Sequence, residues 1–193
     1  MKVKHLLLSF ALAFIATTGM SQDLIYYWNF NSNTPATDTN WEQPIAATTG
    51  DGEITFTVSE VYSFSGTTIN GTSGEVNGGS FAPRGGADMV NNGKDFILDI
   101  PTTGYSNITI TYPTRRTSTG FTNQEVQYTI NGSDWFSKET LDISSYANEW
   151  NEQQFVTIDF SSITEANDNE NFKVKIILTG CTSAVGNNRI DNI

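Results

Sequence analysis

Two adjacent arginines near the middle of the chain are the most distinctive groups with binding chemistry. Arg115 and Arg116 follow "TYP" in a sequence of 10 basic and 21 acidic residues. A guanidinium can fork onto a carboxylate or onto sugar hydroxyls. With Gln127 on a polar strand face, the pair is therefore a candidate polysaccharide contact. The alternative is an ordinary solvated sheet face.

Tryptophans near predicted turns are a second set of candidates, because an exposed indole can stack on a sugar ring. They are Trp41, Trp135 and Trp150. The alternative is that they close the ends of a sandwich, where a large ring with one polar atom also fits.

Histidine and thiolate chemistry is excluded for the mature chain. The only histidine, His5, lies in a segment that we expect to be removed. The only cysteine, Cys181, follows an apolar run and is expected to be a small buried residue at a strand end. Paired carboxylates could still hydrolyse a glycoside, but Glu60, Asp99, Glu125 and Asp159 are scattered. We therefore predict a non-catalytic protein and keep a small carboxylate-dependent hydrolase as the least favoured alternative.

The first 21 residues are typical of a secretory signal peptide. Lys2 and Lys4 precede an apolar run over residues 6–16, and small residues occur at Gly19 and Ser21. We expect cleavage after Ser21 and a protein that is secreted or held at the cell surface. No other segment is long and apolar enough for a membrane-spanning helix.

Charge narrows the choice of partners. Loss of two lysines with the signal peptide changes the formal net charge from −11 to −13. This acidity argues against nucleic acid and anionic membranes as partners, because both attract basic patches. Residues 22–193 have the length of one ordinary domain.

Apolar and polar residues alternate over seven stretches. We expect these stretches to form the strands that hold the candidate arginines, tryptophans and carboxylates in place. The stretches are 24–30, 52–61, 95–100, 106–113, 125–130, 155–160 and 172–178. A period of two indicates strands with one buried and one solvated face, as in antiparallel sheets. We therefore predict an all-β, two-sheet antiparallel β-sandwich of the jelly-roll type, with almost no helix. The predicted core contains Trp28, Phe30, Ile110, Tyr128, Ile158, Val174 and Ile176.

Turn chemistry adds two local expectations. The Asn-Gly pair at 131–132 predicts a hairpin that joins residues 124–130 to a strand beginning near Trp135. The glycine- and asparagine-rich segment 63–94 predicts long loops around one or two short strands.

Three stretches together resemble a known group of domains. They are "YYWNFNS" after the signal peptide, "SNITITYPTRRTSTG" followed by "VQYTINGSDW", and the closing "GNNRIDNI". The sequence resembles jelly-roll domains in the secreted multidomain proteins of polysaccharide-degrading bacteria, proteins that often carry type IX sorting signals. It is more distantly similar to MAM and carbohydrate-binding-module sandwiches. The resemblance implies that the first and last strands lie side by side, with "RIDNI" against "YYWNFN".

The same resemblance implies a structural cation. In such domains, an acidic residue in the terminal strand and polar residues near the first strand often hold one. The matching positions here are Asn29, Asn31 and Asp191, which makes calcium the candidate ion because it accepts carboxylate and amide oxygens. An asparagine stands where the first strand of such domains has an acidic residue, which lowers the ligand charge. The alternative is that Asp191 is solvated or paired with Arg189.

We therefore predict a secreted, non-catalytic module that binds a polysaccharide or surface glycan. The alternative is an accessory domain that contacts other domains of a larger secreted hydrolase or adhesin. The similar domains run a few residues further, so a chain truncated at its C-terminus is also an expectation.

Overall fold

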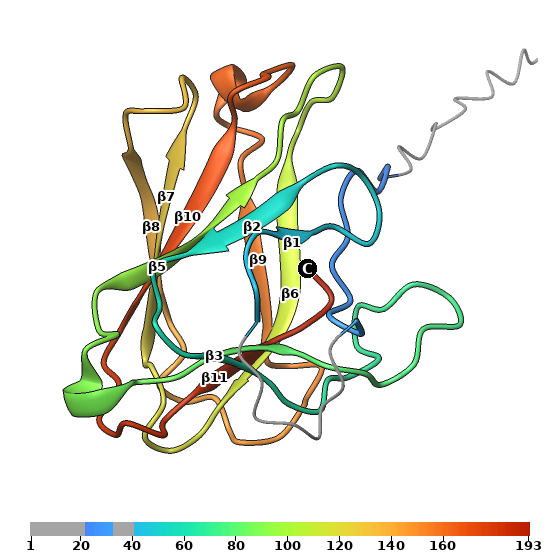
Figure 1. Cartoon of the computed structure of the whole chain (residues 1–193). Coiled ribbons are helices and arrows are strands. Elements are labelled where there is room, and N and C mark those ends of the chain that lie inside the picture. Colours follow the sequence, from blue (N-terminus) through green and yellow to red (C-terminus); the bar gives the residue numbers. More distant parts are fainter. Residues whose placement is uncertain (1–21, 33–40) are drawn as a thin grey trace, which may run out of the picture.

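The alternation of apolar and polar residues produces two sheets that face each other. The computed structural model describes residues 22–32 and 41–193. One sheet has six strands in the order β1-β2-β5-β10-β7-β8, and the other has five in the order β3-β4-β11-β6-β9. All the strand pairs are antiparallel. The two layers can be followed in Figure 1, and the predicted all-β antiparallel sandwich is confirmed. The signal peptide prediction lies outside the described residues.

The strands are mostly short. The six-stranded sheet contains β1 (Ile45–Ala46), β2 (Glu53–Phe56), β5 (Lys94–Asp99), β7 (Asn123–Thr129), β8 (Phe136–Asp142) and β10 (Lys173–Thr179). The five-stranded sheet contains β3 (Val61–Ser63), β4 (Phe81–Pro83), β6 (Thr109–Arg116), β9 (Phe155–Asp159) and β11 (Asn188–Ile190). Two single-turn 3-10 helices, η1 (Ala87–Met89) and η2 (Thr164–Ala166), lie in loops.

The core fills the space between the sheets. Alternate residues of β10 illustrate the pattern, because Val174, Ile176 and Leu178 are fully buried. Six of the seven predicted core residues are buried. The exception is Tyr128, which is partly buried and packs against the core. Its ring centroid lies 5.6 Å from that of Phe136, so it closes the core beside the edge strand β8.

The predicted hairpin and the predicted loop segment are both confirmed. β7 pairs with β8 across the Asn-Gly turn, with Tyr128 opposite Phe136. Between Ser63 and Lys94 the chain forms loops around the short strand β4 and the turn η1. Cys181 is buried just after β10, as expected.

The predicted strand over residues 24–30 is wrong. Only an isolated bridge between Tyr27 and Thr49 forms there. Leu24 is 56% exposed, whereas the consecutive residues Tyr27 and Trp28 are both buried. Their polar atoms find partners in different parts of the chain, so this segment is anchored by side chains and has no regular two-residue period. Phe30 has a positive φ of 50°, which ends the extended backbone.

The final strand lies inside a sheet and not at its edge. β11 pairs with β4 on one side and with β6 on the other. The predicted pairing of "RIDNI" with "YYWNFN" is therefore wrong for Arg189 and Ile190, which pair within the five-stranded sheet. It holds only at the last residue, where Trp28 and Ile193 exchange two backbone hydrogen bonds of 3.0 and 3.2 Å. β4 and β6 are far apart in sequence, and β11 is what joins them.

A residue at the centre of this strand should be costly to truncate. Ile190 is fully buried, whereas Val185 in the preceding loop is 60% exposed. We expect Ile190→Ala to lower the free energy of unfolding by about 2–5 kcal/mol, since it leaves a cavity between the sheets. Val185→Ala should change it by less than about 0.5 kcal/mol. Urea unfolding of both variants measures the difference, and equal stabilities would contradict the central position of β11.

Candidate functional site

The outer face of the five-stranded sheet carries a group of arginines and aromatic rings. Arg115 on β6 lies opposite Arg189 on β11 in the antiparallel register. Alternation along both strands points these side chains away from the core, while Ile190 and Arg116 point inward. We call the group the arginine–aromatic face, and its half-buried members are Tyr62, Phe64, Arg84, Arg115, Trp150 and Arg189.

Each guanidinium of this face lies over an aromatic ring. Arg84 lies 4.5 Å from the ring centroid of Tyr62, and Arg189 lies 4.5 Å from that of Phe64. Arg115 lies 5.7 Å from the ring of Trp150. The attraction between a cation and the face of a ring is worth about 0.5–2 kcal/mol. The buried Nε atoms of all three arginines have no hydrogen-bond partner in the described part of the chain, so stacking contributes to holding the side chains in place.

Two of these arginines form no ion pair with a described residue. Arg84 lies 3.8 Å from the carboxylate of Glu60. Arg115 and Arg189 form no ion pair within residues 22–32 and 41–193. Burial, together with the charge of the neighbouring Arg115, lowers the pKa of Arg189 to about 10. Burial also lowers the pKa of Arg115, against an opposing effect of Glu149. The face therefore holds two adjacent positive charges that are partly desolvated.

The other predicted arginine has a different environment. Arg116 points into the sandwich, where it is 8% exposed. Its guanidinium donates hydrogen bonds of 2.9–3.1 Å to backbone carbonyls of Ser118, Gly120, Phe121 and Ser144. Successive residues of a strand face opposite sides, so the adjacent pair Arg115 and Arg116 is divided between surface and interior.

The remaining predicted sugar contacts lie in separate places. Gln127 is on the outer face of the six-stranded sheet, where its amide donates to Glu125 at 2.8 Å. On that face the Lys175 ammonium lies 3.7 Å from the ring centroid of Trp135. Trp41 is only 7% exposed and donates to the Ser80 carbonyl, which suits a core residue and leaves no open ring face. The predicted set is thus divided: Arg115 and Trp150 lie together beside the five-stranded sheet, and Gln127 and Trp135 both lie next to Lys175 on the six-stranded sheet.

Asp191 is buried under a loop of the same sheet. Its position points away from the core, but residues 65–79 cover it and leave it 1% exposed. Its carboxylate accepts backbone N–H groups of Thr67 at 2.7 Å and Asn192 at 2.9 Å. No described lysine or arginine forms an ion pair with it. The alternatives of a solvated Asp191 and of a pair with Arg189 are therefore both wrong.

The lack of a basic partner has an electrostatic consequence. Burial raises the pKa of Asp191 to about 7, and the negative charge of Glu75 contributes to the rise. Below that pH the folded protein favours the neutral acid. At higher pH the buried negative charge requires stabilisation by hydrogen bonds or by a cation.

The predicted partners Asn29 and Asn31 lie against the same loop. Both side-chain amides donate to Glu75 Oε1 at 2.9 Å. Asn29 Oδ1 accepts bonds from Asn31 N and from Thr48. Asn31 Oδ1 is buried with no donor among the residues that the structure describes. Glu75 was not predicted as part of this group, because it is 44 residues from Asn31 in a stretch without alternation.

Two glycines bring the asparagine and the aspartate together. A Cβ at Gly66 would overlap the Asp191 carboxylate, and a Cβ at Gly78 would overlap the Asn31 amide. Gly66 N donates to Gly78 O at 2.8 Å. The side chains of Asp191 and Asn31 therefore each contact one member of this hydrogen-bonded glycine pair. The described residues hold no group of three His, Cys, Asp or Glu side chains suited to a metal. A cation here would depend on amide and backbone oxygens as well as carboxylates.

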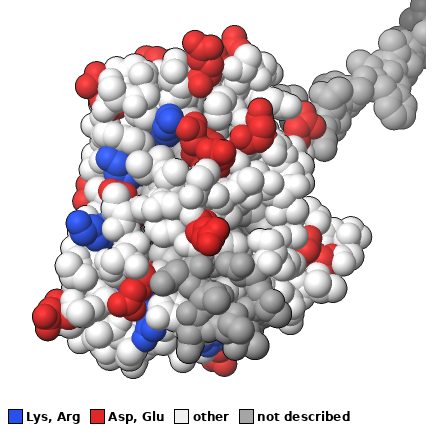
Figure 2. All heavy atoms as spheres, viewed as in Figure 1, with Lys and Arg blue, Asp and Glu red and all other residues white. Residues whose placement is uncertain are grey.

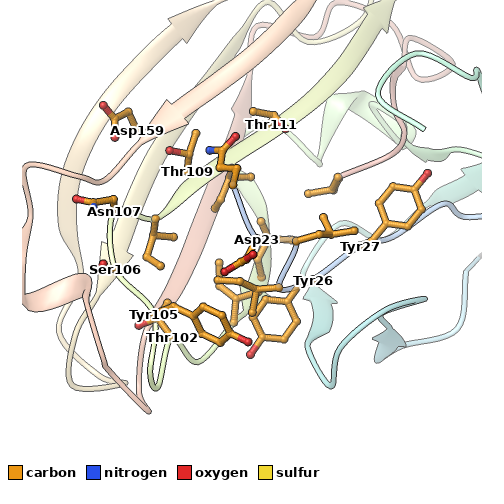
Figure 3. Close-up of a pocket in the computed structure, with 18 of the residues that line it drawn as sticks. Asp23, Tyr26, Tyr27, Thr102, Tyr105, Ser106, Asn107, Thr109, Thr111 and Asp159 are labelled. Carbon is orange, nitrogen blue, oxygen red and sulfur yellow. The ribbon is translucent and has the colours of Figure 1, made fainter. Parts of the chain in front are cut away.

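A groove of about 760 Å³ lies beside the N-terminal segment. Figure 3 shows Tyr26 and Tyr105 at one end and Asp159 with Thr109 at the other. Apolar residues such as Leu98, Ile108 and Ile193 also line the groove, and its lining includes no lysine or arginine. Its hydroxyl groups and tyrosine rings would suit a neutral ligand better than an anionic one.

The carboxylates considered for catalysis lie in separate places, and several of them contact other groups. Asp99 pairs with Lys173 at 2.5 Å, and Glu60 lies near Arg84. Asp159 accepts the Ser161 N–H at 2.8 Å. In the view of Figure 2, acidic side chains are spread over the surface in many places. None of these contacts brings two of the candidate carboxylates together.

Comparisons with known proteins give only distant likenesses. No protein family and no curated protein matches the sequence. The K2 adhesin domain of Lys-gingipain aligns with 86% of this chain and 96% of that one, at 11% identity and a TM-score of 0.49. A xylanase 10B chain of Clostridium thermocellum, which contains a CBM22 module, aligns with 67% of this chain and 23% of that one, at 11% identity and a TM-score of 0.38. At these values neither alignment assigns a function. Among the described residues, no helix has the length and apolarity needed to cross a membrane.

The division of the arginine pair predicts effects of very different size for the same substitution at the two positions. Arg116→Met should strongly destabilise the fold, because each buried carbonyl left without a donor costs about 1–3 kcal/mol. Arg115→Met should change stability much less, since its guanidinium donates one hydrogen bond within the described part of the chain, to Asn148 Oδ1. Thermal unfolding measures both. A similar melting temperature for the two variants would contradict the structural role of Arg116.

Proposed function

We propose that this chain is a secreted, non-catalytic module that binds a polysaccharide or surface glycan through the arginine–aromatic face. The observation that carries the proposal is the pair Arg115 and Arg189, which are adjacent, partly desolvated and without a counter-ion in the described residues. An unpaired guanidinium offers several fixed N–H donors to a ligand. Sugar hydroxyl, carboxylate and sulfate oxygens are suitable acceptors.

The surroundings of the pair favour binding over a purely structural role. Trp150 and Phe64 hold the two guanidiniums from the side, which reduces the conformational entropy lost on binding. The Trp150 indole is fixed in turn by a 3.2 Å bond to the Ser65 carbonyl. The face is therefore preorganised. The dispersed carboxylates described above support a binding function rather than hydrolysis.

Two half-buried tryptophans on opposite sheets can locate the binding face. Trp150→Ala should weaken retention on a polysaccharide by about 10-fold, because it removes a buried aromatic support. Trp135→Ala is the matched control on the six-stranded sheet and should leave retention unchanged. Affinity electrophoresis through gels that contain neutral or acidic polysaccharides measures both, with melting temperatures as a folding check.

Other outcomes would reassign the site or remove it. Loss of retention only with Trp135→Ala would place binding on the six-stranded sheet. Loss only with Tyr105→Ala would place it in the groove. If the wild type is retained by no polysaccharide, the proposed function is wrong.

We further propose that calcium binds beside Asp191 and stabilises the loop over residues 65–79. The residues fit the ion in two respects: among the described residues, the buried carboxylate of Asp191 has no basic partner, and the buried Asn31 Oδ1 has no donor. Asp191, Asn31 and Glu75 would hold the ion, and oxygen donors of this kind are those that calcium prefers. Asn29 is a weaker candidate, because its oxygen already accepts two hydrogen bonds.

Calcium should then raise thermal stability at pH 8, where Asp191 is ionised. A ligand that binds only the folded state stabilises it by about 2.7 kcal/mol at 100 times its Kd. We expect a higher melting temperature in calcium than in chelator for the wild type, and no difference for Asp191→Asn. The exposed Asp88→Asn is the control and should behave as the wild type. Superimposable wild-type curves with calcium and with chelator would rule out the ion.

A further inference from the structure

We propose that the arginine–aromatic face selects an acidic polysaccharide, with carboxylate or sulfate groups bound at Arg115 and Arg189. This inference rests on the proposed function and specifies its ligand class. Three features of the face support it: the two adjacent arginine charges, the covered aromatic rings and the N–H donors that remain for a ligand.

The first feature is the spacing of the two charges. Directly opposite residues of an antiparallel pair have Cα atoms about 4.5–5.5 Å apart, and Arg115 and Arg189 are such a pair. Both side chains leave the same side of the sheet, and each disfavours the charge of the other. An anion between them relieves this repulsion and accepts N–H donors from both. A neutral sugar would leave the repulsion in place.

The second feature is the state of the aromatic rings. Neutral sugars commonly bind proteins by stacking on an open ring face. Here Arg189 covers one face of Phe64 and Arg115 lies over Trp150. Phe64 also stacks with Tyr62, with centroids 6.0 Å apart and planes 15° from parallel. The guanidinium groups, rather than bare rings, are thus presented to a ligand.

The third feature is the number of donors that remain for a ligand. A guanidinium carries five N–H donors. Arg115 donates to Asn148 Oδ1 at 2.7 Å through Nη2. Arg189 makes no side-chain hydrogen bond with the described residues. Both therefore keep terminal N–H groups that match the fork geometry of a carboxylate or sulfate.

The acidity of the chain favours a polysaccharide over a nucleic acid. The formal net charge of −11 repels any polyanion at long range. Duplex DNA carries a charge about every 1.7 Å, so its binding requires an extended basic surface. Two unpaired arginines provide a local site. A glycan with separated acidic groups needs only a local site of this kind, although Glu149 acts on Arg115 from nearby.

Affinity electrophoresis tests the ligand class directly. Polygalacturonate is the carboxylated probe, chondroitin sulfate the sulfated probe, and dextran and xylan are the neutral probes. We expect retention of the wild type in at least one acidic gel and little in the neutral gels. Arg115→Gln and Arg189→Gln should each weaken that retention by about 10-fold, the effect of losing a charge-assisted hydrogen bond. Lys94→Gln makes the same change in charge on the other sheet and should have no effect.

The possible failures are distinguishable. Retention in neutral gels alone would overturn the acidic ligand but leave the proposed glycan-binding function intact. Retention in no gel would overturn both. Acidic retention that survives both arginine substitutions would remove the face from the site. Equal binding of single-stranded DNA, or an equal loss with Lys94→Gln, would show unselective attraction of polyanions and also overturn the proposal. Melting temperatures of each variant exclude loss of binding through unfolding.

Discussion

The buried carboxylate of Asp191 is the constraint on which the arrangement of this molecule depends most. It fixes a long polar loop to the final strand through the Thr67 N–H at 2.7 Å. Few apolar residues in that loop could hold it by hydrophobic burial. Gly66 is required beneath the carboxylate because a side chain would overlap it. This loop is therefore held by hydrogen bonds to the buried Asp191 carboxylate, whereas the strands of the sandwich are held by apolar packing.

The same strand links this anchor to the candidate binding face. Arg189 and Asp191 are two residues apart and leave the sheet on the same side. The loop that covers Asp191 begins at Phe64 and Ser65, which contact Arg189 and Trp150 respectively. Disturbance of the anchor would thus reach the aromatic supports of both unpaired arginines. β11 carries Arg189, and Asp191 follows the last residue of that strand, which is paired with both β4 and β6.

Much of the fold could be predicted from the sequence, because alternation is a local property. Residues 95–100, 106–113 and 172–178 have one apolar face each, and they form β5, β6 and β10 near the predicted positions. The segment 24–30 has a similar pattern but no continuous strand partner. Its anchors are distant, as the bond of 2.7 Å from the Tyr27 hydroxyl to Asn192 shows. A pattern predicts which face is apolar, but the presence of a hydrogen-bonding neighbour depends on the whole topology.

The candidate site was less predictable for the same reason. Arg115 and Arg116 are alike in type, and the alternation of β6, in which Ile110, Tyr112 and Arg116 are buried, determines which one faces solvent. The register with β11 then determines that Arg189 lies opposite Arg115. Arg189 joins the face from 74 residues away, and nothing near it in the sequence indicates this. Glu75 likewise reaches the asparagines from a loop without periodicity. Local composition could nominate Arg115, Trp150, Asn31 and Asp191 separately. The short strand β11 lies between β4 and β6 and explains how these residues are divided. The positive charge of Arg189 is half-buried, whereas the negative charge of Asp191, on the same side of the sheet, is buried under a loop.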